Sequence, residues 1–128
     1  MSDELANKKK ILIIEDNIET QLIFKIYLRD KYLLEIADTA EKGLELLNKD
    51  LFDVLLLDIN LPGDLSGEDV IKKVKKDYKL EKIPVVVVTA YALKGDREKY
   101  LGLGADEYVP KPVTKSTLLG IVDKYMCV

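Results

Sequence analysis

The chain has 128 residues, the size of one ordinary domain, and its 48% hydrophobic and 34% charged residues give the balance of a globular protein. Its formal net charge of -3 and its pI of about 5.1 argue against a whole-domain preference for nucleic acid or an anionic membrane. There is no histidine and one cysteine, Cys127, which excludes His-based general base catalysis and an internal disulfide. No apolar run has the length of a membrane span or the form of a signal peptide, so we expect a soluble, cytoplasmic protein.

The N-terminal part of the chain is polar, and we expect a flexible extension over residues 1–9 and one domain over 10–128. The apolar run at 11–14 predicts a short buried strand. Asn17 then offers the side chain of an N-cap. The helix that it starts carries apolar residues at helical spacing, which are Leu22, Ile23, Ile26 and Tyr27.

A second strand is predicted at 32–36. The pattern from Asp38 to Glu41 is typical of a capping box at the start of a helix. Behind it, Ala40, Leu44 and Leu47 recur on one face. These features predict an amphipathic helix after the second strand.

The third apolar run, 54–57, shows no polar alternation, which predicts a strand covered on both faces, as in a parallel sheet. It stops at Asp58, and a loop follows. Ser66 and Asp69 form another capping-box pattern, for a helix with the apolar residues Val70, Ile71 and Val74.

The last third of the chain continues the alternation. Four valines at 85–88 predict a strand that ends at Thr89, and a weaker helical pattern, interrupted by Gly95, covers 91–103. A fifth strand is predicted at 104–109, and Thr114 can cap a final helix. Five alternations with short connections predict one α/β domain, in which helices cover both faces of a five-stranded parallel sheet.

Chemistry-bearing residues follow four of the five predicted strands. The carboxyl ends of parallel strands share one edge, so we expect Glu15, Asp16, Asp58, Thr89 and Lys111 to lie together. Three carboxylates there would repel one another by about 4 kcal/mol per close pair at an effective dielectric of 20. Such a site needs a cation or raised pKa values, and oxygen ligands without His or Cys suit Mg²⁺.

The remaining groups of this set suit a phosphoryl group. Lys111 adds a positive charge and Thr89 a hydroxyl, each able to bind one oxygen of a transferring phosphate. Asp58 would be the nucleophile, because carboxylates form aspartyl phosphates. Each residue alone has a simpler interpretation as a turn, strand or surface residue, but their convergence at one edge favours the site.

The ordered set of motifs resembles the receiver domain of two-component response regulators, the CheY-like family, from residue 10 to 126. The motifs are the acidic pair at 15–16, Leu-Leu-Leu-Asp58-Ile-Asn-Leu-Pro, Thr89–Ala90, and Gly-Ala-Asp-Glu-Tyr-Val-Pro-Lys-Pro, which ends at Pro112. The stretch 89–96 is most similar to single-domain regulators of the DivK type and to the receivers of hybrid kinases. The resemblance implies a (βα)5 flavodoxin-like fold with strand order 2-1-3-4-5.

The resemblance also implies a phosphoacceptor signalling domain that catalyses only its own phosphorylation and dephosphorylation. Asp58 would accept a phosphoryl group from a phosphohistidine of a histidine kinase or histidine phosphotransferase. Mg²⁺ would be held by Asp16, Asp58 and the main-chain carbonyl of Asn60, and Glu15 would act through metal-bound water.

Further roles follow from the same resemblance. Thr89 and Lys111 would bind the phosphoryl oxygens, and Tyr108 would change rotamer as Thr89 moves. Asn60 and Tyr91 would tune the phosphate lifetime, and the Lys111–Pro112 peptide bond would be cis.

We expect the signal to leave through a protein surface. The face formed by 94–100, Tyr108 and 114–125 would change shape and contact a downstream protein, with no nucleic acid or membrane bound directly. Ile18 and Leu22, on the first helix, are candidates for docking a phosphodonor helix bundle and equally for the core.

One departure from the family pattern is expected. From Asp58 to Gly67 the chain has one residue more than the common spacing, so the loop at 63–67 should bulge or lengthen.

Two other functions compete with a signalling switch. Asp58-Ile-Asn60 faintly resembles the nucleophile motif of haloacid dehalogenases, which would make the protein a Mg²⁺-dependent phosphohydrolase, but the ending at Lys111–Pro112 matches a receiver better. A flavodoxin-like cofactor binder is disfavoured, because no Ser/Thr-rich phosphate loop follows the first strand.

Overall fold

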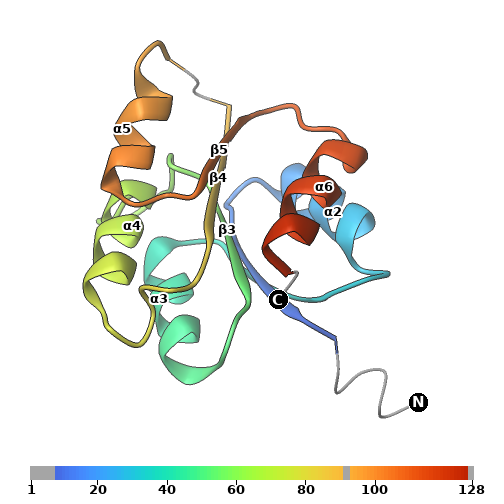
Figure 1. The fold of residues 1–128 in the computed structure, drawn as a ribbon, viewed down its shortest axis with the longest axis horizontal. Helices are drawn as coiled ribbons and strands as arrows, with labels where there is room; N and C mark the ends of the chain where they lie inside the picture. Colours follow the sequence, from blue (N-terminus) through green and yellow to red (C-terminus); the bar gives the residue numbers. More distant parts are fainter. Residues whose placement is uncertain (1–7, 91–92, 127–128) are drawn as a thin grey trace.

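The computed structural model describes residues 8–90 and 93–126, in which strands and helices alternate (Figure 1). The strands are β1 (Lys10–Ile14), β2 (Leu33–Ala37), β3 (Val54–Leu57), β4 (Val85–Thr89) and β5 (Glu107–Pro110). The helices are α2 (Ile18–Leu28), α3 (Ala40–Lys49), α4 (Gly67–Lys76), α5 (Asp96–Leu103) and α6 (Lys115–Met126). All strand pairs are parallel and the order is β2-β1-β3-β4-β5, which confirms the predicted fold and strand order.

The sheet lies between two helical layers. Figure 1 shows α3, α4 and α5 on one face and α2 with α6 on the other. Successive residues of β1 therefore point into different cores: Leu12 and Ile14 pack toward α3 and α4, whereas Ile11 and Ile13 pack toward α2 and α6. All four residues of β3 are buried, as its unbroken apolar run predicts. Burying each such side chain contributes about 1.5–3 kcal/mol, which makes the sheet a firm frame for the loops at its edges.

Three predicted helix caps are confirmed. The Asn17 side chain accepts the N–H of Thr20, and Ser66 with Asp69 forms a complete capping box. The Thr114 hydroxyl accepts the N–H of Thr117 at 3.2 Å. Each cap is typically worth about 1 kcal/mol.

The cap of α3 was predicted one residue too early. Thr39 is the N-cap and its hydroxyl accepts the N–H of Lys42 at 3.1 Å. Asp38 instead forms an ion pair with the Lys42 ammonium at 3.0 Å. Because Ser, Thr and Asp are all good N-caps, the order Asp38-Thr39 alone does not decide between them.

Helix α2 forms where expected, but the apolar residues that indicated it do not make its buried side. Phe24 and Leu28 are buried, while Ile18 is 77% and Leu22 is 56% exposed. Ile23 and Ile26 are also exposed. The helix is apolar around most of its circumference, so spacing indicated a helix without indicating which side faces the sheet.

Two glycines explain the boundaries in the last third of the chain. Gly95 has a φ of 91°, and α5 begins after it at Asp96, later than the predicted start at 91. Gly104, with a φ of 118°, ends α5, and β5 starts only at Glu107 rather than at 104. Residues 91 and 92 lie outside the described part of the chain. Within the described ranges, no helix is long and apolar enough to cross a membrane.

Candidate functional site

The carboxyl edge of the sheet brings four strand ends together. Glu15 and Asp16 follow β1, Asp58 follows β3, Thr89 is the last residue of β4, and Lys111 follows β5. The hydrogen-bond ladder continues past the strands, because the N–H of Asp58 donates to the carbonyl of Ile14 at 3.0 Å. The site residues are thus positioned by backbone bonds as well as by their loops.

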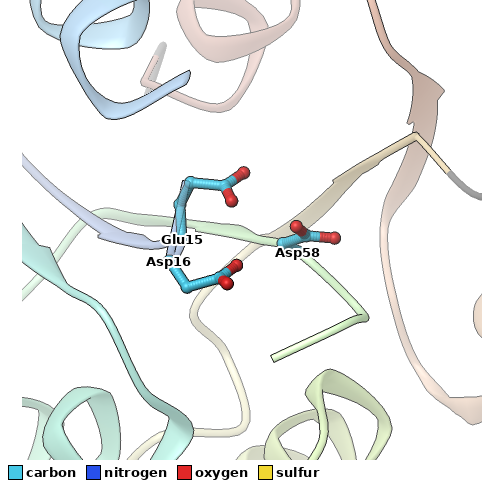
Figure 2. A group of neighbouring side chains, drawn as sticks. All are labelled: Glu15, Asp16 and Asp58. Atoms are coloured by element: carbon cyan, nitrogen blue, oxygen red, sulfur yellow. The ribbon is translucent and has the colours of Figure 1, made fainter. Parts of the chain in front are cut away.

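Three carboxylates meet at this edge (Figure 2). One carboxylate oxygen from each of Glu15, Asp16 and Asp58 lies within 4.8 Å of the other two. Glu15 is 1% exposed and Asp58 is 7% exposed, while Asp16 is open to solvent. Water screens the buried pair poorly, so the cluster carries a strong excess of negative potential.

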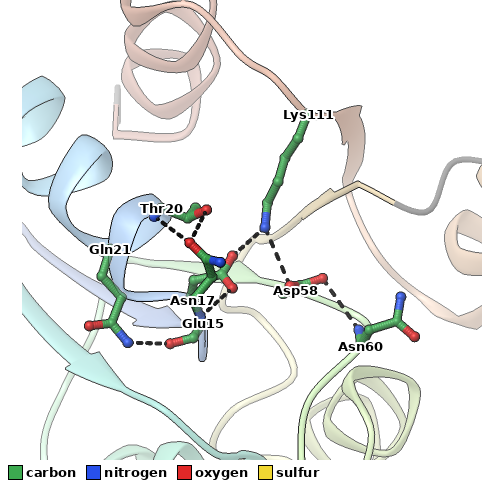
Figure 3. Close-up of polar contacts among 7 residues, drawn as sticks. All are labelled: Glu15, Asn17, Thr20, Gln21, Asp58, Asn60 and Lys111. Carbon is green, nitrogen blue, oxygen red and sulfur yellow. Dashed lines mark hydrogen bonds and ion pairs between the residues drawn. The ribbon is translucent and has the colours of Figure 1, made fainter.

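Lys111 supplies one positive charge to this cluster (Figure 3). Its ammonium lies 2.5 Å from Oε1 of Glu15 and 3.4 Å from Oδ2 of Asp58. Burial raises the pKa of Glu15 above its ordinary value, and the hydrogen bond from Lys111 opposes that rise. One ammonium among three carboxylates leaves the site short of positive charge.

The loop after Asp58 and the last two strands complete the site. The N–H of Asn60 donates to Oδ1 of Asp58 at 3.3 Å (Figure 3). Thr89 is fully buried at the end of β4. Tyr108 is buried on β5 and stacks on Tyr100, with ring centroids 6.0 Å apart. The Lys111–Pro112 peptide bond is cis.

Comparison with known proteins identifies this arrangement. The family model described as "Response regulator receiver domain" matches residues 11–123. The chain belongs to the response regulator receiver domain family. Receiver domains are phosphoacceptor modules of two-component signalling, in which a carboxylate forms an aspartyl phosphate.

Relatives of this receiver domain include both single-domain and hybrid proteins. The polar-differentiation response regulator DivK of Brucella suis is 32% identical over 119 residues, which cover 92% of this chain and 96% of DivK. The hybrid signal transduction histidine kinase I of Dictyostelium discoideum is 32% identical over 127 residues, covering 93% of this chain but only 7% of the kinase. The similarity to the kinase therefore concerns one small part of that protein.

Solved structures give the same result. A CheY-like receiver domain protein from Methanospirillum hungatei is 33% identical with a TM-score of 0.83, covering 92% of this chain and 93% of that one. The receiver domain of a sensor histidine kinase from Pseudomonas aeruginosa is 26% identical with a TM-score of 0.86, covering 94% and 99%. That crystal structure has a magnesium ion coordinated in the active site cleft.

The residues of this receiver domain fit such an ion. Mg²⁺ prefers oxygen ligands and binds through one or two carboxylates while it keeps several waters. Asp16 is exposed and its carboxylate lies within 4.8 Å of those of Glu15 and Asp58, so an ion could reach the cluster from the side of Asp16. An ion there would also relieve the charge imbalance that Lys111 alone does not correct.

Contacts that support the acidic pair were not anticipated from the sequence. The Gln21 side-chain amide donates to the main-chain carbonyl of Glu15 at 2.6 Å, and the N–H of Asn17 donates to Oε2 of Glu15 at 3.1 Å (Figure 3). Gln21 lies six residues beyond Glu15, and no spacing rule links the two residues. Their contact depends on how α2 folds back over the strand end.

Gly67 is a second residue whose role was missed. A Cβ atom at this position would lie 2.3 Å from the main-chain oxygen of Asp58 and 2.6 Å from Cα of Ile59. Its N–H also donates to the carbonyl of Ile59 at 2.9 Å. The start of α4 thus packs against the backbone of Asp58 so closely that no side chain fits at position 67 without a shift of the backbone. A glycine directly after the Ser66 N-cap, where other residues favour helix more, was the available signal.

Tyr91, predicted to tune the phosphate lifetime, lies outside the described residues. The loop between β3 and α4 turns at Gly63, which has a φ of 97°. The extra residue expected in this loop stays a prediction.

Proposed function

We propose that Asp58 of this receiver domain accepts a phosphoryl group from the phosphohistidine of a histidine kinase or histidine phosphotransferase. The supporting observation is the cluster of Glu15, Asp16 and Asp58, with Lys111 as the one ammonium that the described residues bring to it. A deficit of positive charge beside a buried carboxylate suits Mg²⁺, and the bound ion together with Lys111 would then offset the negative charge of an incoming phosphoryl group.

Each residue has a part in this transfer. A carboxylate oxygen of Asp58 forms a bond to phosphorus while the phosphorus–nitrogen bond of the donor breaks, and its electron pair stays on the imidazole nitrogen. Lys111 and Thr89 donate hydrogen bonds to the phosphoryl oxygens. Asp16, Asp58 and the main-chain carbonyl of Asn60 would hold Mg²⁺, with Glu15 reaching it through water, and the bound ion supplies positive charge for the transferring group.

Phosphotransfer profiling tests this proposal. Purified histidine kinases and phosphotransferases carrying labelled phosphohistidine are each mixed with the chain and with Asp58→Asn. We expect at least one donor to transfer a single phosphoryl group to the parent chain and none to the variant, since an amide is a poor nucleophile. Label that survives Asp58→Asn at the parent level would contradict the role of Asp58.

The same samples separate a switch from a phosphohydrolase. A switch accepts one phosphoryl group per chain and releases it slowly, catalysing only its own phosphorylation and dephosphorylation. A phosphohydrolase turns over many equivalents of a small phosphate ester such as p-nitrophenyl phosphate. We expect no release of p-nitrophenol faster than the slow breakdown of the aspartyl phosphate itself.

The exposed face of α2 is the proposed docking site for the phosphodonor. Ile18, Leu22 and Ile26 present apolar side chains to solvent, and Ile23 lines a hollow of about 160 Å³ that reaches Lys111 and Pro112. A helix of the donor that packed on this face would lie next to the carboxyl edge of the sheet, where Asp58 is located.

A matched pair of variants tests this docking face. Leu22→Glu should slow transfer from a phosphorylated protein donor by 10-fold or more while leaving phosphorylation by acetyl phosphate intact. Lys9→Gln makes the same change in charge at an exposed side chain before β1, at the opposite edge of the sheet, and should leave both rates unchanged. Equal slowing of both donors by Leu22→Glu would count against docking.

We propose that phosphorylation changes the surface formed by α5, β5 and α6, and that a downstream protein binds this surface. The aspartyl phosphate would draw Thr89 toward it, and Tyr108 would turn into the vacated space, away from its stack on Tyr100. Beryllofluoride with Mg²⁺ mimics the phosphoryl group and should shift amide resonances in residues 94–100, 108 and 114–125. Unaltered resonances there at saturation would exclude this route.

We propose a cytoplasmic location for the domain, since one cysteine suits a reducing compartment. The boundary between an extension over 1–9 and a domain over 10–128 also stays a proposal.

A further inference from the structure

A surface groove runs along α3 and α4, on the face of the sheet opposite α2. Three hollows form it, one of about 410 Å³ and two of about 500 Å³, and Asn48 lines all three. The groove extends from Leu65, in the loop after β3, to Leu51 and Ile83 near the amino edge of the sheet. We call it the α3–α4 groove.

Apolar side chains line much of this groove. Leu44 and Leu80 pack against the core on one side and line the groove on the other. Leu51 and Tyr78 lie at its margins and are 88% and 80% exposed. Two large apolar or aromatic side chains exposed to solvent beside an apolar hollow are typical of a surface that binds another molecule.

Four lysines and three acidic residues line the groove, and the lysine-rich segment 72–82 adds to its positive charge. Residues 72–82 contain six lysines and two acidic residues, in a chain whose net charge is -3. Within residues 8–90 and 93–126, Lys73, Lys76 and Lys79 form no ion pair, although Lys72 and Lys75 lie within 4 Å of Glu68 and Asp106. All three line the groove, and the ammonium of Lys79 lies over the ring of Tyr78, 5.9 Å from its centroid.

Three acidic residues line the groove: Glu41, Asp50 and Asp77. Asp50 pairs with the ammonium of Lys10, which lowers the pKa of Asp50. Oδ1 of Asp77 accepts the N–H of Lys79 at 2.8 Å. Lysines still outnumber acidic residues in the segment 72–82, and a negatively charged ligand would meet Lys73 and Lys76 without displacing an ion pair among the described residues.

We propose that the α3–α4 groove binds an acidic segment of a partner protein that also carries apolar side chains. The lysines would pair with its carboxylates, and the leucines and Tyr78 would cover its apolar groups. Lys73, Lys76 and Lys79 have no ion pair among the described residues and lie beside apolar side chains. This arrangement suits a peptide better than nucleic acid, which needs a longer row of basic residues. The ten residues of α3 span about 15 Å, a length that a short segment can follow. This site is separate from Asp58 and does not depend on its phosphorylation.

The test is an amide NMR titration of the full chain with a synthetic peptide of alternating glutamate and leucine. We expect saturable shifts at Asn48, Lys73, Lys76 and Tyr78. Two companion peptides separate the contributions: one carries lysine in place of glutamate, and the other serine in place of leucine. Each should bind at least 10-fold more weakly, because each lacks one of the two recognised features.

Charge-reversal variants place the site. The triple variant Lys73→Glu, Lys76→Glu and Lys79→Glu should weaken binding of the acidic peptide by 10-fold or more. Leu51→Ser, which keeps all charges, should weaken it several-fold. A control triple reversal at Lys25, Lys94 and Lys115, all exposed on other faces, should change it by less than 2-fold.

Several outcomes would overturn the proposal. These are the absence of saturable shifts with the acidic peptide, shifts confined to other elements, and equal binding of the lysine peptide. Equal binding of the serine peptide or of polyphosphate would indicate a general polyanion surface instead. Shifts at the groove that depend on protein concentration without any peptide would indicate a second copy of the chain as the occupant.

Discussion

At each edge of the parallel sheet a lysine lies among three carboxylates, but the two sets differ in their exposure to solvent. At the amino edge, the main-chain N–H of Lys10 donates to Asp53 at 2.8 Å, and its ammonium pairs with Asp50 and with Glu35. The side chains of Glu35 and Asp50 are 38% and 46% exposed. Water hydrates these exposed carboxylates and Lys10 pairs with two of them, so this edge holds the same ratio of charges without needing a bound cation.

The carboxyl edge holds similar groups with less water. Lys111 contacts Glu15 and Asp58, whose side chains are 1% and 9% exposed. The pKa shifts of the two edges have opposite signs: the Lys10 hydrogen bond lowers the pKa of Asp50, whereas burial raises the pKa of Glu15. Burial therefore distinguishes a site from a surface ion pair here, and a count of charges does not.

The largest expected difference between the edges is in their response to Mg²⁺. Asp16→Asn removes a proposed ligand, and we expect Mg²⁺ affinity to fall by 100-fold or more. Without the ion, the variant should be more stable than the parent, because one repulsive charge is gone. Thermal unfolding across a Mg²⁺ titration measures both effects.

The matched change at the amino edge is Asp50→Asn. It should leave Mg²⁺ affinity within 2-fold of the parent, since its partners are Lys10 and solvent. If both variants lost Mg²⁺ affinity equally, the two edges would not differ as proposed.

A smaller loss of Mg²⁺ affinity is expected from Gly67→Ala, which disturbs the carboxyl edge through the backbone of Asp58. The added Cβ would meet the main-chain oxygen of Asp58 at 2.3 Å, so either α4 or the acceptor loop must shift. We expect a destabilisation of roughly 1–3 kcal/mol, the usual range for overpacking, together with about 10-fold weaker Mg²⁺ binding. Urea unfolding and calorimetric titration measure these two quantities.

The control for this change is Gly120→Ala. Gly120 is exposed in α6, and a Cβ there has no neighbour within 4 Å. This variant should gain about 0.5–1 kcal/mol of stability from helix propensity and keep Mg²⁺ affinity. Normal Mg²⁺ binding by Gly67→Ala would show that its contact with Asp58 does not position the site.

The smallest expected effect is the pH dependence of the amino edge. The pKa of Asp50 is lowered from 3.8 by Lys10, so its contribution to stability is complete above 3.8 and is lost as the pH falls through the lowered value. The free energy of unfolding should therefore fall less between neutral and acid pH for Asp50→Asn than for the parent. Urea unfolding at a series of pH values measures this difference. The difference should shrink in high salt, because this pair is exposed. If the parent and Asp50→Asn lost the same amount of stability between neutral and acid pH, the assignment would be contradicted.

The sheet and its carboxyl edge were predictable because few arrangements satisfy five apolar runs separated by helical patterns. An unbroken run such as 54–57 requires cover on both faces, and parallel strands place Asp58 beside the residues that follow the other strands. The caps at Asn17 and Ser66 were predictable for a similar reason, since a side chain binds its own first turn.

The remaining features depend on distances between elements that local patterns do not contain. Phe24 rather than Leu22 faces the sheet because of how α2 rotates against β1, and α2 is apolar on both sides. The contact of Gly67 with the Asp58 backbone and the closer approach of Lys111 to Glu15 than to Asp58 also arise only once the layers pack.

The most direct test of the carboxyl edge is intact-mass spectrometry after incubation with acetyl phosphate. We predict that the parent chain and Asp50→Asn each gain the mass of one phosphoryl group when Mg²⁺ is present and none when it is chelated. Asp58→Asn should gain none in either condition. A parent chain that stays unmodified with Mg²⁺, or an Asp58→Asn variant that gains the same mass, would contradict the assignment of Asp58 as a Mg²⁺-assisted phosphoacceptor.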